Sequence, residues 1–334
     1  MIDPILPAVV DRLRSVGALE HAAVERVTIG DSVVMVELSG VSGASRVGAE
    51  TAGSEERTRA SGLAHRPPGD SASVAETDLE TLLRWASCGP GDTFTDFDEG
   101  DGSSGNEDGG EGADGTDNGD ATALETALGV ATVNALSAPF IDWSEGDPMA
   151  LVEPSVDTIA TVGVFRPAFR KFSDVDVRVI ERRDVGAVSA PDGVRVTTFR
   201  PSEATAAMAD ADVVFITGST FVYGGLERYL EAAPATATVV LIGATASVLP
   251  EPTFDAGVDV LAGAAVTDPE GVREAVRAGA CGTDLHDAGV RKVYTMVDEA
   301  AGLERGMQRR RTDRSDRDGE SDEQPNDTET EADQ

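Results

Sequence analysis

Small polar residues follow two apolar runs in the second half of the chain. One run reads DVVFITGST over Asp212–Thr220, and the other reads VVLIGATASVLP over Val239–Pro250. Backbone N–H groups at the start of a helix or turn have no partner within it, so such turns can bind a carboxylate or a phosphate. The ligand-binding residues predicted here are Thr217, Gly218, Ser219, Thr220, Gly243, Thr245 and Ser247. The alternative is that the hydroxyl groups of these turns only cap helices.

A second group of candidates surrounds an earlier apolar run. Glu181 lies eighteen residues after Gly163, and in dinucleotide-binding folds an acidic residue about 20 residues beyond the first glycine binds ribose hydroxyls. The turn that contains Gly163 and Phe165 has no second or third glycine, so a pyrophosphate could not approach it closely. An adenosine-type ligand such as S-adenosylmethionine remains compatible. We therefore add Gly163, Phe165 and Glu181 to the ligand site, with a surface ion pair of Glu181 as the alternative.

The first half of the chain contributes His65 and Asn134. His65 and Arg66 lie in a loop bounded by glycine and proline, and together they could hold an anion or supply one imidazole. Asn134 lies among small apolar residues on a predicted helix, where an unsatisfied amide would cost about 1–3 kcal/mol. It therefore either braces a neighbouring loop or points into a ligand cleft.

A metal site is suggested only weakly by residue types. Cys281 and His286 have a spacing that could hold a soft metal ion, but they provide two ligands where zinc requires three or four. The alternative is an ordinary loop near Gly282. Because Cys and His are scarce, a divalent metal ion would take oxygen ligands or be held through the small molecule itself. The sequence does not identify a cofactor.

These residues require a fold that brings them to one place. Continuous apolar runs indicate strands buried on both faces, and alternation with helices of about 8–12 residues favours a parallel sheet. We predict an α/β protein with a Rossmann-like doubly wound parallel sheet over residues 155–304, preceded by a smaller α+β domain. Ligands bind beyond the carboxyl ends of the strands in such sheets, which is where the small polar turns fall.

The smaller domain is predicted over residues 1–142, with a linker over 143–154. It should begin with an amphipathic helix, continue with a hairpin and a long loop, and end with two helices. The predicted hairpin strands, loop and helices are Val24–Ile29, Ser32–Leu38, Ser39–Asp70, Asp78–Ser87 and Ala121–Ser137. Residues 92–120 and 305–334 are acidic and poor in apolar residues, so we predict a disordered acidic insertion and a disordered acidic tail.

The overall charge restricts the functional class. The chain has 61 acidic and 27 basic residues and a formal net charge of −34, and its only lysines are Lys171 and Lys292. This composition favours a halophilic, cytoplasmic protein that stays hydrated in concentrated salt. A chain so acidic should not bind nucleic acid, and no apolar run is long enough to suggest a membrane partner. We expect a small molecule or a metal as the partner.

Four segments together resemble a known family. They are TGST at Thr217–Thr220, IGATAS with LP at Ile242–Pro250, FDAGV at Phe254–Val258, and LGVATVNAL at Leu128–Leu136. In this order they are similar to the putative heavy-metal chelation family, in which a Rossmann-like domain follows a domain like the amino-terminal domain of enolase. The chain resembles a haloarchaeal-type member. It departs from the family at Tyr223-Gly224-Gly225, where an asparagine is usual.

The resemblance implies a cleft between the two domains and a homodimer. On this basis the first functional hypothesis is a protein that binds a small ligand, with or without a metal ion, at the carboxyl edge of the sheet. The second hypothesis is an enzyme that acts on a small metabolite or uses a nucleoside cofactor such as S-adenosylmethionine. The sequence does not decide between binding and turnover.

Overall fold

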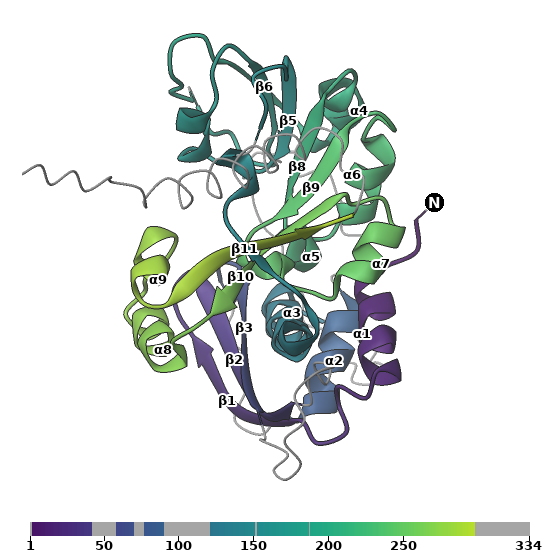
Figure 1. Ribbon diagram of the computed structural model, residues 1–334, viewed down its shortest axis with the longest axis vertical. Helices are drawn as coiled ribbons and strands as arrows, with labels where there is room; N and C mark the ends of the chain where they lie inside the picture. Colours follow the sequence, from purple (N-terminus) through teal and green to yellow (C-terminus); the bar gives the residue numbers. More distant parts are fainter. Residues whose placement is uncertain are drawn as a thin grey trace, which may run out of the picture.

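The computed structural model describes residues 2–41, 58–69, 77–89, 121–150, 152–186 and 188–297. Within these residues the chain forms a small antiparallel sheet and a large, mostly parallel sheet, with helices packed around both (Figure 1). The predicted insertion over 92–120 and the predicted tail over 305–334 lie outside the described residues. In the described part of the chain, no helix is both long and apolar enough to cross a bilayer.

The small sheet is antiparallel, with strand order β1-β2-β3. Its elements, with the helices of this half of the chain, are α1 (Ile5–Ser15), β1 (Ala23–Ile29), β2 (Val33–Val41), β3 (Thr58–His65), α2 (Leu79–Cys88) and α3 (Ala123–Ser137). The predicted hairpin is confirmed, since the N–H of Gly30 donates to the carbonyl oxygen of Val33 at 2.9 Å. The predicted helices are confirmed with shifts of one or two residues.

Strand β3 was not predicted, because the whole of residues 39–70 was expected to be a loop. The strand pairs with β2 from Val33 opposite His65 to Val41 opposite Thr58. It has little hydrophobic alternation because small residues let it lie directly on α3: a Cβ atom on Gly62 would be 2.0 Å from the carbonyl oxygen of Ala131. The missing signal is therefore a consequence of close backbone packing.

Helix α3 is enclosed by the rest of the molecule. Every residue of it from Thr126 to Ser137 is buried. Its amino terminus has a capping box in which Thr122 and Glu125 satisfy each other's backbone N–H groups. A helix buried on all sides must be covered by several elements, and α3 contacts α1, α2, β2, β3 and α5.

The large sheet has strand order β4-β11-β10-β9-β8-β5-β6-β7. Its strands are β4 (Ser144–Glu145), β5 (Thr158–Val162), β6 (Asp176–Ile180), β7 (Arg195–Phe199), β8 (Val213–Thr217), β9 (Thr238–Ile242), β10 (Val260–Val266) and β11 (Val290–Met296). Strands β5 to β10 are parallel, and β11 and β4 are antiparallel additions at one edge. The predicted doubly wound sheet is confirmed, and the chain reverses its direction of strand addition between β5 and β8.

Helices cover the two faces of the large sheet unequally. The face toward α3 carries α4 (Ala204–Met208), α5 (Thr220–Tyr223), α6 (Leu226–Ala232) and α7 (Pro250–Asp255). On the other face, the described residues between β5 and β7 contain the short 3-10 helix η3 (Ala168–Lys171) instead of α-helices. The rings of Phe169 and Phe172 pack beside Phe215 of β8 there. The expected alternation with longer helices therefore holds for only part of the sheet.

The two sheets are joined by a shared interior. One buried cluster contains Val9, Val36 and Leu128 from the first half of the chain together with Ile216 and Leu241 from the large sheet. On the opposite face of the small sheet, Met35 and Leu63 pack against helix α8 (Pro269–Arg277) and helix α9 (Thr283–Asp287). The small sheet thus lies between α3 and the α8–α9 pair (Figure 1).

Candidate functional site

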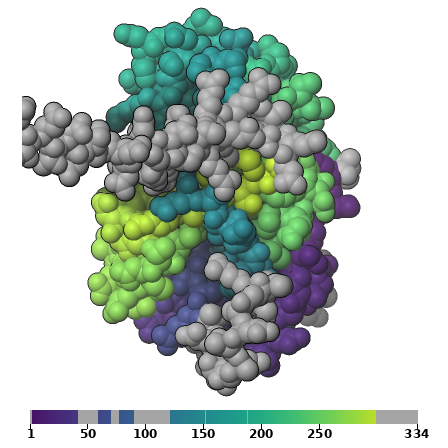
Figure 2. All heavy atoms as spheres, in the orientation of Figure 1, coloured from purple at the N-terminus to yellow at the C-terminus, as the bar shows by residue number. Residues whose placement is uncertain are grey.

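A cleft of about 1020 Å³ opens where the carboxyl edge of the large sheet faces the end of β3. Its walls come from the turns after β5, β6, β8 and β9, from His65 at the end of β3 and the following Arg66, and from the segment Gly146–Met149. The chain between α3 and β5 crosses the face of the molecule seen in Figure 2, where its blue-green atoms lie next to the yellow-green atoms of the C-terminal strand. Ser144 and Glu145 of this predicted linker pair with β11.

The cleft contains the point at which the strand order reverses. Gly163 follows β5 and Thr217 ends β8, and both residues line the cleft. Gly163 has φ +93°, and a Cβ atom there would be 3.2 Å from Cγ2 of Thr217. Glycine therefore leaves space between two neighbouring strands at the position where doubly wound sheets bind ligands.

The predicted polar turns divide into residues that line the cleft and residues that support it. Thr217, Ser219, Gly243 and Thr245 line the cleft. The hydroxyls of Thr217 and Ser219 lie 3.1 Å apart, and Thr245 Oγ1 accepts the backbone N–H of His65 at 2.9 Å. These four residues and His65 from the first half of the chain thus meet at one surface.

Gly218, Thr220 and Ser247 lie behind that surface. A Cβ atom on Gly218 would be 2.7 Å from the backbone nitrogen of Ala246, so the turns after β8 and β9 touch through their backbones. The hydroxyl of Thr220 donates to the carbonyl of Thr217 at 2.7 Å, and Ser247 Oγ accepts the N–H of Ala264 at 2.9 Å. The structure gives these hydroxyls internal partners.

Asn134 joins the two halves of the site from behind. Its Nδ2 donates to the carbonyl oxygens of Leu63 at 2.8 Å, Thr245 at 3.2 Å and Ala244 at 3.3 Å. The side chain is buried and does not line the cleft. Of the two possibilities left by the sequence, bracing a loop is the one observed, and the braced elements are β3 and the turn after β9.

His65 belongs to an aromatic and cationic group on one wall. Its Nε2 lies 3.0 Å from the hydroxyl of Tyr223, and the guanidinium carbon of Arg182 lies 3.9 Å from the centre of the Tyr223 ring. Burial of the imidazole, with the nearby charges of Arg182 and Arg183, lowers the pKa of His65 below its ordinary value of 6.5. A neutral imidazole next to a phenol can accept or relay a proton.

Glu181 and Phe165 complete the predicted set on the same wall, and both line the cleft. Glu181 directly follows β6, and its Oε1 accepts the backbone N–H groups of Arg182 at 2.8 Å and Arg183 at 3.3 Å. The carboxylate therefore holds the turn that presents the two arginines. Among the described residues, Glu181 forms these backbone contacts and not the surface ion pair that was the alternative.

Cys281 and His286 also line the cleft, but the described residues contain no group of three or more His, Cys, Asp or Glu side chains that could hold a metal ion. His286 Nδ1 instead lies 3.1 Å from the carbonyl oxygen of Val290. Cys281 and His286 alone are fewer side-chain ligands than a zinc site requires.

Sequence reasoning missed a lysine cluster in the cleft. Lys171 and Lys292, the only lysines of the chain, both line the cleft and both donate to Oδ2 of Asp147, Lys292 at 2.7 Å. Burial opposes ionisation of Asp147, but the two ammonium groups outweigh it and hold the pKa of this carboxyl below its ordinary value of 3.8. The signal in the sequence was the rarity of lysine, which we interpreted only as a consequence of composition.

The cleft has a charge balance unlike that of the chain. Five basic and three acidic side chains line it, whereas the whole chain has 61 acidic and 27 basic residues. The basic residues of the lining are Arg66, Lys171, Arg182, Arg183 and Lys292. A surplus of positive charge within a strongly acidic protein focuses a local field that attracts anions.

Comparisons with known proteins agree with this architecture. A model of the family described as Putative heavy-metal chelation (DUF364) matches residues 147–295. A DUF364 protein of unknown function from Pyrococcus horikoshii has a similar structure, with a TM-score of 0.62 and 20% identity over 88% of this chain and 100% of that chain. A second DUF364 structure, from Desulfitobacterium hafniense DCB-2, has a TM-score of 0.57 and 16% identity over 88% and 98%. A search of curated proteins found no match.

The two structural similarities are at low sequence identity, so they concern the fold alone. The family model covers strands β5 to β10 and nearly all of β11, and its match begins at Asp147. Over residues 147–295, the chain is therefore similar to the putative heavy-metal chelation family that its sequence motifs resemble.

Proposed function

We propose that the protein binds a small, negatively charged molecule in the cleft, alone or as a complex with a metal ion. The observation that carries this proposal is the local surplus of basic side chains in a chain with a net charge of −34. The lining also offers the hydroxyls of Thr217 and Ser219. Cations with a few oriented polar groups form a typical site for carboxylates and phosphates.

The family description mentions heavy metals, and the proposal accommodates a metal in one way. Thiolate chelation by the described residues lacks a third ligand, because Cys281 and His286 have no further Cys, His, Asp or Glu with which to form a metal-binding group there. A chelating molecule could instead bring the metal with it and be held by its acidic groups. The protein would then recognise the chelate through the arginines and lysines of the cleft.

A second candidate function is an enzyme that uses a nucleoside cofactor such as S-adenosylmethionine. One observation favours it: Glu181 lines the cleft at the end of the strand next to the reversal point. In doubly wound folds this position binds ribose hydroxyls. The neutral His65 and the hydroxyl of Tyr223 would then be available for acid–base chemistry on the same wall.

We also propose that the protein is a halophilic, cytoplasmic homodimer. The excess of acidic residues supports the first two properties, and the family resemblance supports the third. Light scattering coupled to size exclusion in molar KCl measures the oligomeric state directly, and a monomeric mass would contradict the dimer.

The binding proposal is tested by thermal unfolding in molar KCl with separate additions of phosphate, di- and tricarboxylates, divalent metals, metal citrate complexes and S-adenosylmethionine. A ligand that binds the native state raises the midpoint. We expect shifts with anions or anionic chelates that persist in the double variant Cys88→Ser, Cys281→Ser. A shift with free metal alone, lost in that variant, would contradict the proposal. A shift with S-adenosylmethionine that is lost in Glu181→Ala would favour the enzyme.

A further inference from the structure

Three segments far apart in sequence meet at Asp147. Lys171 is 24 residues away on η3, and Lys292 is 145 residues away on β11. The Asp147 side chain is 14% exposed, and the two lysine side chains are 33% and 50% exposed. The carboxylate is thus enclosed while the ammonium groups remain open to the cleft that all three residues line.

The carboxylate is held in place independently of the lysines. Its Oδ1 accepts the backbone N–H of Met149 at 3.1 Å, whereas both ammonium groups use Oδ2. Each ammonium has three N–H donors, and the contact with Asp147 uses one of them. Two positive charges around one negative charge leave a net positive charge and several donors on the cleft side.

The choice of lysine is informative in this chain. Every other basic residue is arginine, which is the better partner for a fixed carboxylate because its planar fork binds both oxygens. At Asp147 that fork is absent, and both ammonium groups bond to a single oxygen. A compact ammonium can direct its remaining donors to a third group, so this arrangement suits an additional oxyanion better than a closed ion pair.

We propose that Lys171 and Lys292, held by Asp147, form a subsite that binds one oxyanion of the ligand, either a phosphate or a carboxylate. This inference rests on the proposed binding function and deepens it by naming the chemical group and its residues. A single oxyanion would accept one hydrogen bond from each ammonium and would lie between η3 and β11. The Arg182–Arg183 turn remains available for another part of the same molecule.

Because the chain has only two lysines, each can be observed directly by NMR. The full chain is expressed without a tag that would introduce further lysines. Protein labelled with ¹³C at lysine Cε should show two lysine signals, which the Lys171→Arg and Lys292→Arg variants assign. Inorganic phosphate and malonate are titrated separately in KCl, with ionic strength kept constant. We expect both signals to shift with one common, saturable dissociation constant in at least one titration. Phosphate and malonate then distinguish the two kinds of oxyanion.

Charge-removing variants test the same subsite by calorimetry. Lys171→Gln and Lys292→Gln should each weaken binding of the responding anion by about tenfold, the loss of one charge-assisted hydrogen bond. Arg170→Gln is the matched control, because it removes the same charge from an exposed neighbour that does not line the cleft. Thermal unfolding of each variant without ligand shows whether the fold is retained.

Two results would overturn the subsite. One is that neither anion moves the lysine signals at constant ionic strength. The other is that Arg170→Gln weakens binding as much as the lysine variants do, which would indicate only a general charge effect. If ligands from the thermal panel still bind while the lysine signals stay unchanged, the subsite is wrong and the proposed binding function stands. If no ligand shifts the midpoint, the binding function fails as well.

Discussion

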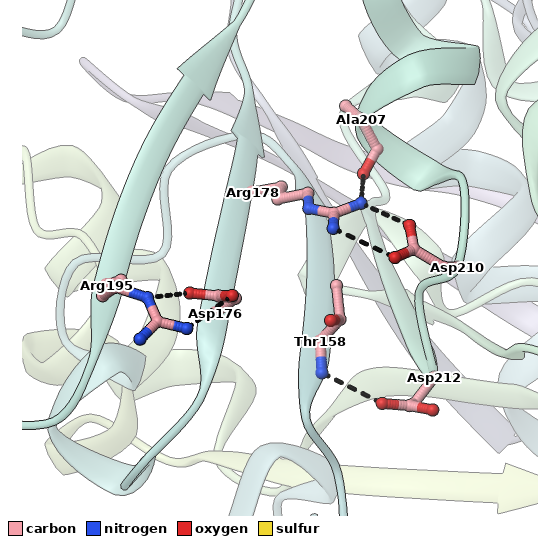
Figure 3. A network of polar contacts seen from close by, with 7 residues as sticks. All are labelled: Thr158, Asp176, Arg178, Arg195, Ala207, Asp210 and Asp212. Carbon is pink, nitrogen blue, oxygen red and sulfur yellow. Dashed lines mark hydrogen bonds and ion pairs between the residues drawn. The ribbon is translucent and has the colours of Figure 1, made fainter.

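The two ends of the large sheet use their charged residues in opposite ways. At the amino ends of the strands, carboxylates are paired with backbone or guanidinium groups: Asp212 Oδ2 accepts the N–H groups of Asp157 and Thr158 at 2.9 Å each. Arg178 binds Asp210 at 2.8 Å and Arg195 binds Asp176 at 2.7 Å (Figure 3). The charges at this end hold neighbouring strands and loops together.

At the carboxyl ends of the strands, the cationic side chains are not each paired with a carboxylate. Arg182 lies on the ring of Tyr223, and no described carboxylate forms an ion pair with Arg182 or Arg183. Lys171 and Lys292 share a single aspartate. The backbone there is held by the buried neutral side chain of Asn134 and by the Glu181 carboxylate, which forms no ion pair with a described residue. One sheet therefore separates residues that stabilise the fold from residues free to contact a ligand.

The largest expected loss of unfolding free energy comes from replacing the neutral Asn134 side chain at the carboxyl end by a charged one. Asn134→Asp would place a carboxylate beside three carbonyl oxygens, and an unpaired buried charge costs about 3–5 kcal/mol of unfolding free energy. Guanidinium chloride unfolding measures the loss. The matched variant at the amino end is Asp212→Asn, whose exposed side chain keeps an acceptor and should cost about 1 kcal/mol or less. Equal losses would contradict the distinction between the two ends.

The next effect concerns the glycine turn that shapes the cleft floor. Gly218→Ala would put a Cβ atom 2.7 Å from the backbone nitrogen and 2.8 Å from Cβ of Ala246. Such overpacking costs about 1–3 kcal/mol, and it should separate the turns after β8 and β9. Differential scanning calorimetry gives the stability change. A variant as stable as the parent would show that the two turns can move apart freely.

A matched pair of arginine variants compares the two ends for binding. Arg183→Gln removes a cation from the cleft lining, whereas Arg195→Gln removes one from the amino end. With the anion that gives the largest thermal shift, we expect Arg183→Gln to weaken binding about three- to tenfold because a charge-assisted contact is lost. Arg195→Gln should leave the dissociation constant unchanged. Calorimetry measures both, and equal weakening would mean that only net charge matters.

The smallest expected effect is a difference between the two ends in how their contribution to the unfolding free energy depends on pH. Because the pKa of His65 is lowered below 6.5 in the folded protein, the unfolded chain takes up this proton first. The stability contributed by neutral His65 is therefore present above pH 6.5 and is lost as the pH falls through the folded pKa, with a slope of at most about 1.4 kcal/mol per pH unit. Unfolding free energies measured between pH 7.5 and 5 should show this slope, and His65→Gln should remove it.

The ion pairs of the amino end should respond in stronger acid. Hydrogen bonds from Arg195 and Arg178 hold the pKa values of Asp176 and Asp210 below their ordinary value of 3.8. Their contribution is present above pH 3.8 and is lost as the pH falls through the folded values. If His65→Gln keeps the slope between pH 7.5 and 5, the slope does not come from His65 and this assignment is wrong.

The sequence predicted some parts of the fold well because their signals are local. The strands β8 and β9 are continuous apolar runs that end at glycine, and the structure has them at Val213–Thr217 and Thr238–Ile242. The capping residues Thr122 and Asp78 mark the starts of α3 and α2 in the same way. By contrast, β3 is rich in small residues, so its hydrophobic alternation is weak even though it pairs along its full length.

For the candidate site, the turns were predictable and their partners were not. Thr217, Ser219, Gly243 and Thr245 line the cleft together because the carboxyl ends of parallel strands meet at one edge of a sheet. The contact of Thr245 with the backbone of His65 spans 180 residues of sequence. No local sequence pattern predicts such a contact, because it depends on how the small sheet packs between α3 and α8.

By itself, the amino-acid sequence determined the doubly wound sheet and the edge at which polar turns collect, since apolar periodicity and glycine positions act over a few residues. The tertiary structure alone decided which charges share the cleft. Lys171, Asp147 and Lys292 become neighbours only after β11 has joined the sheet beside β10 and β4 has paired with it. Electrostatic interactions depend on distance in space, and that distance is set by the packing of complete elements.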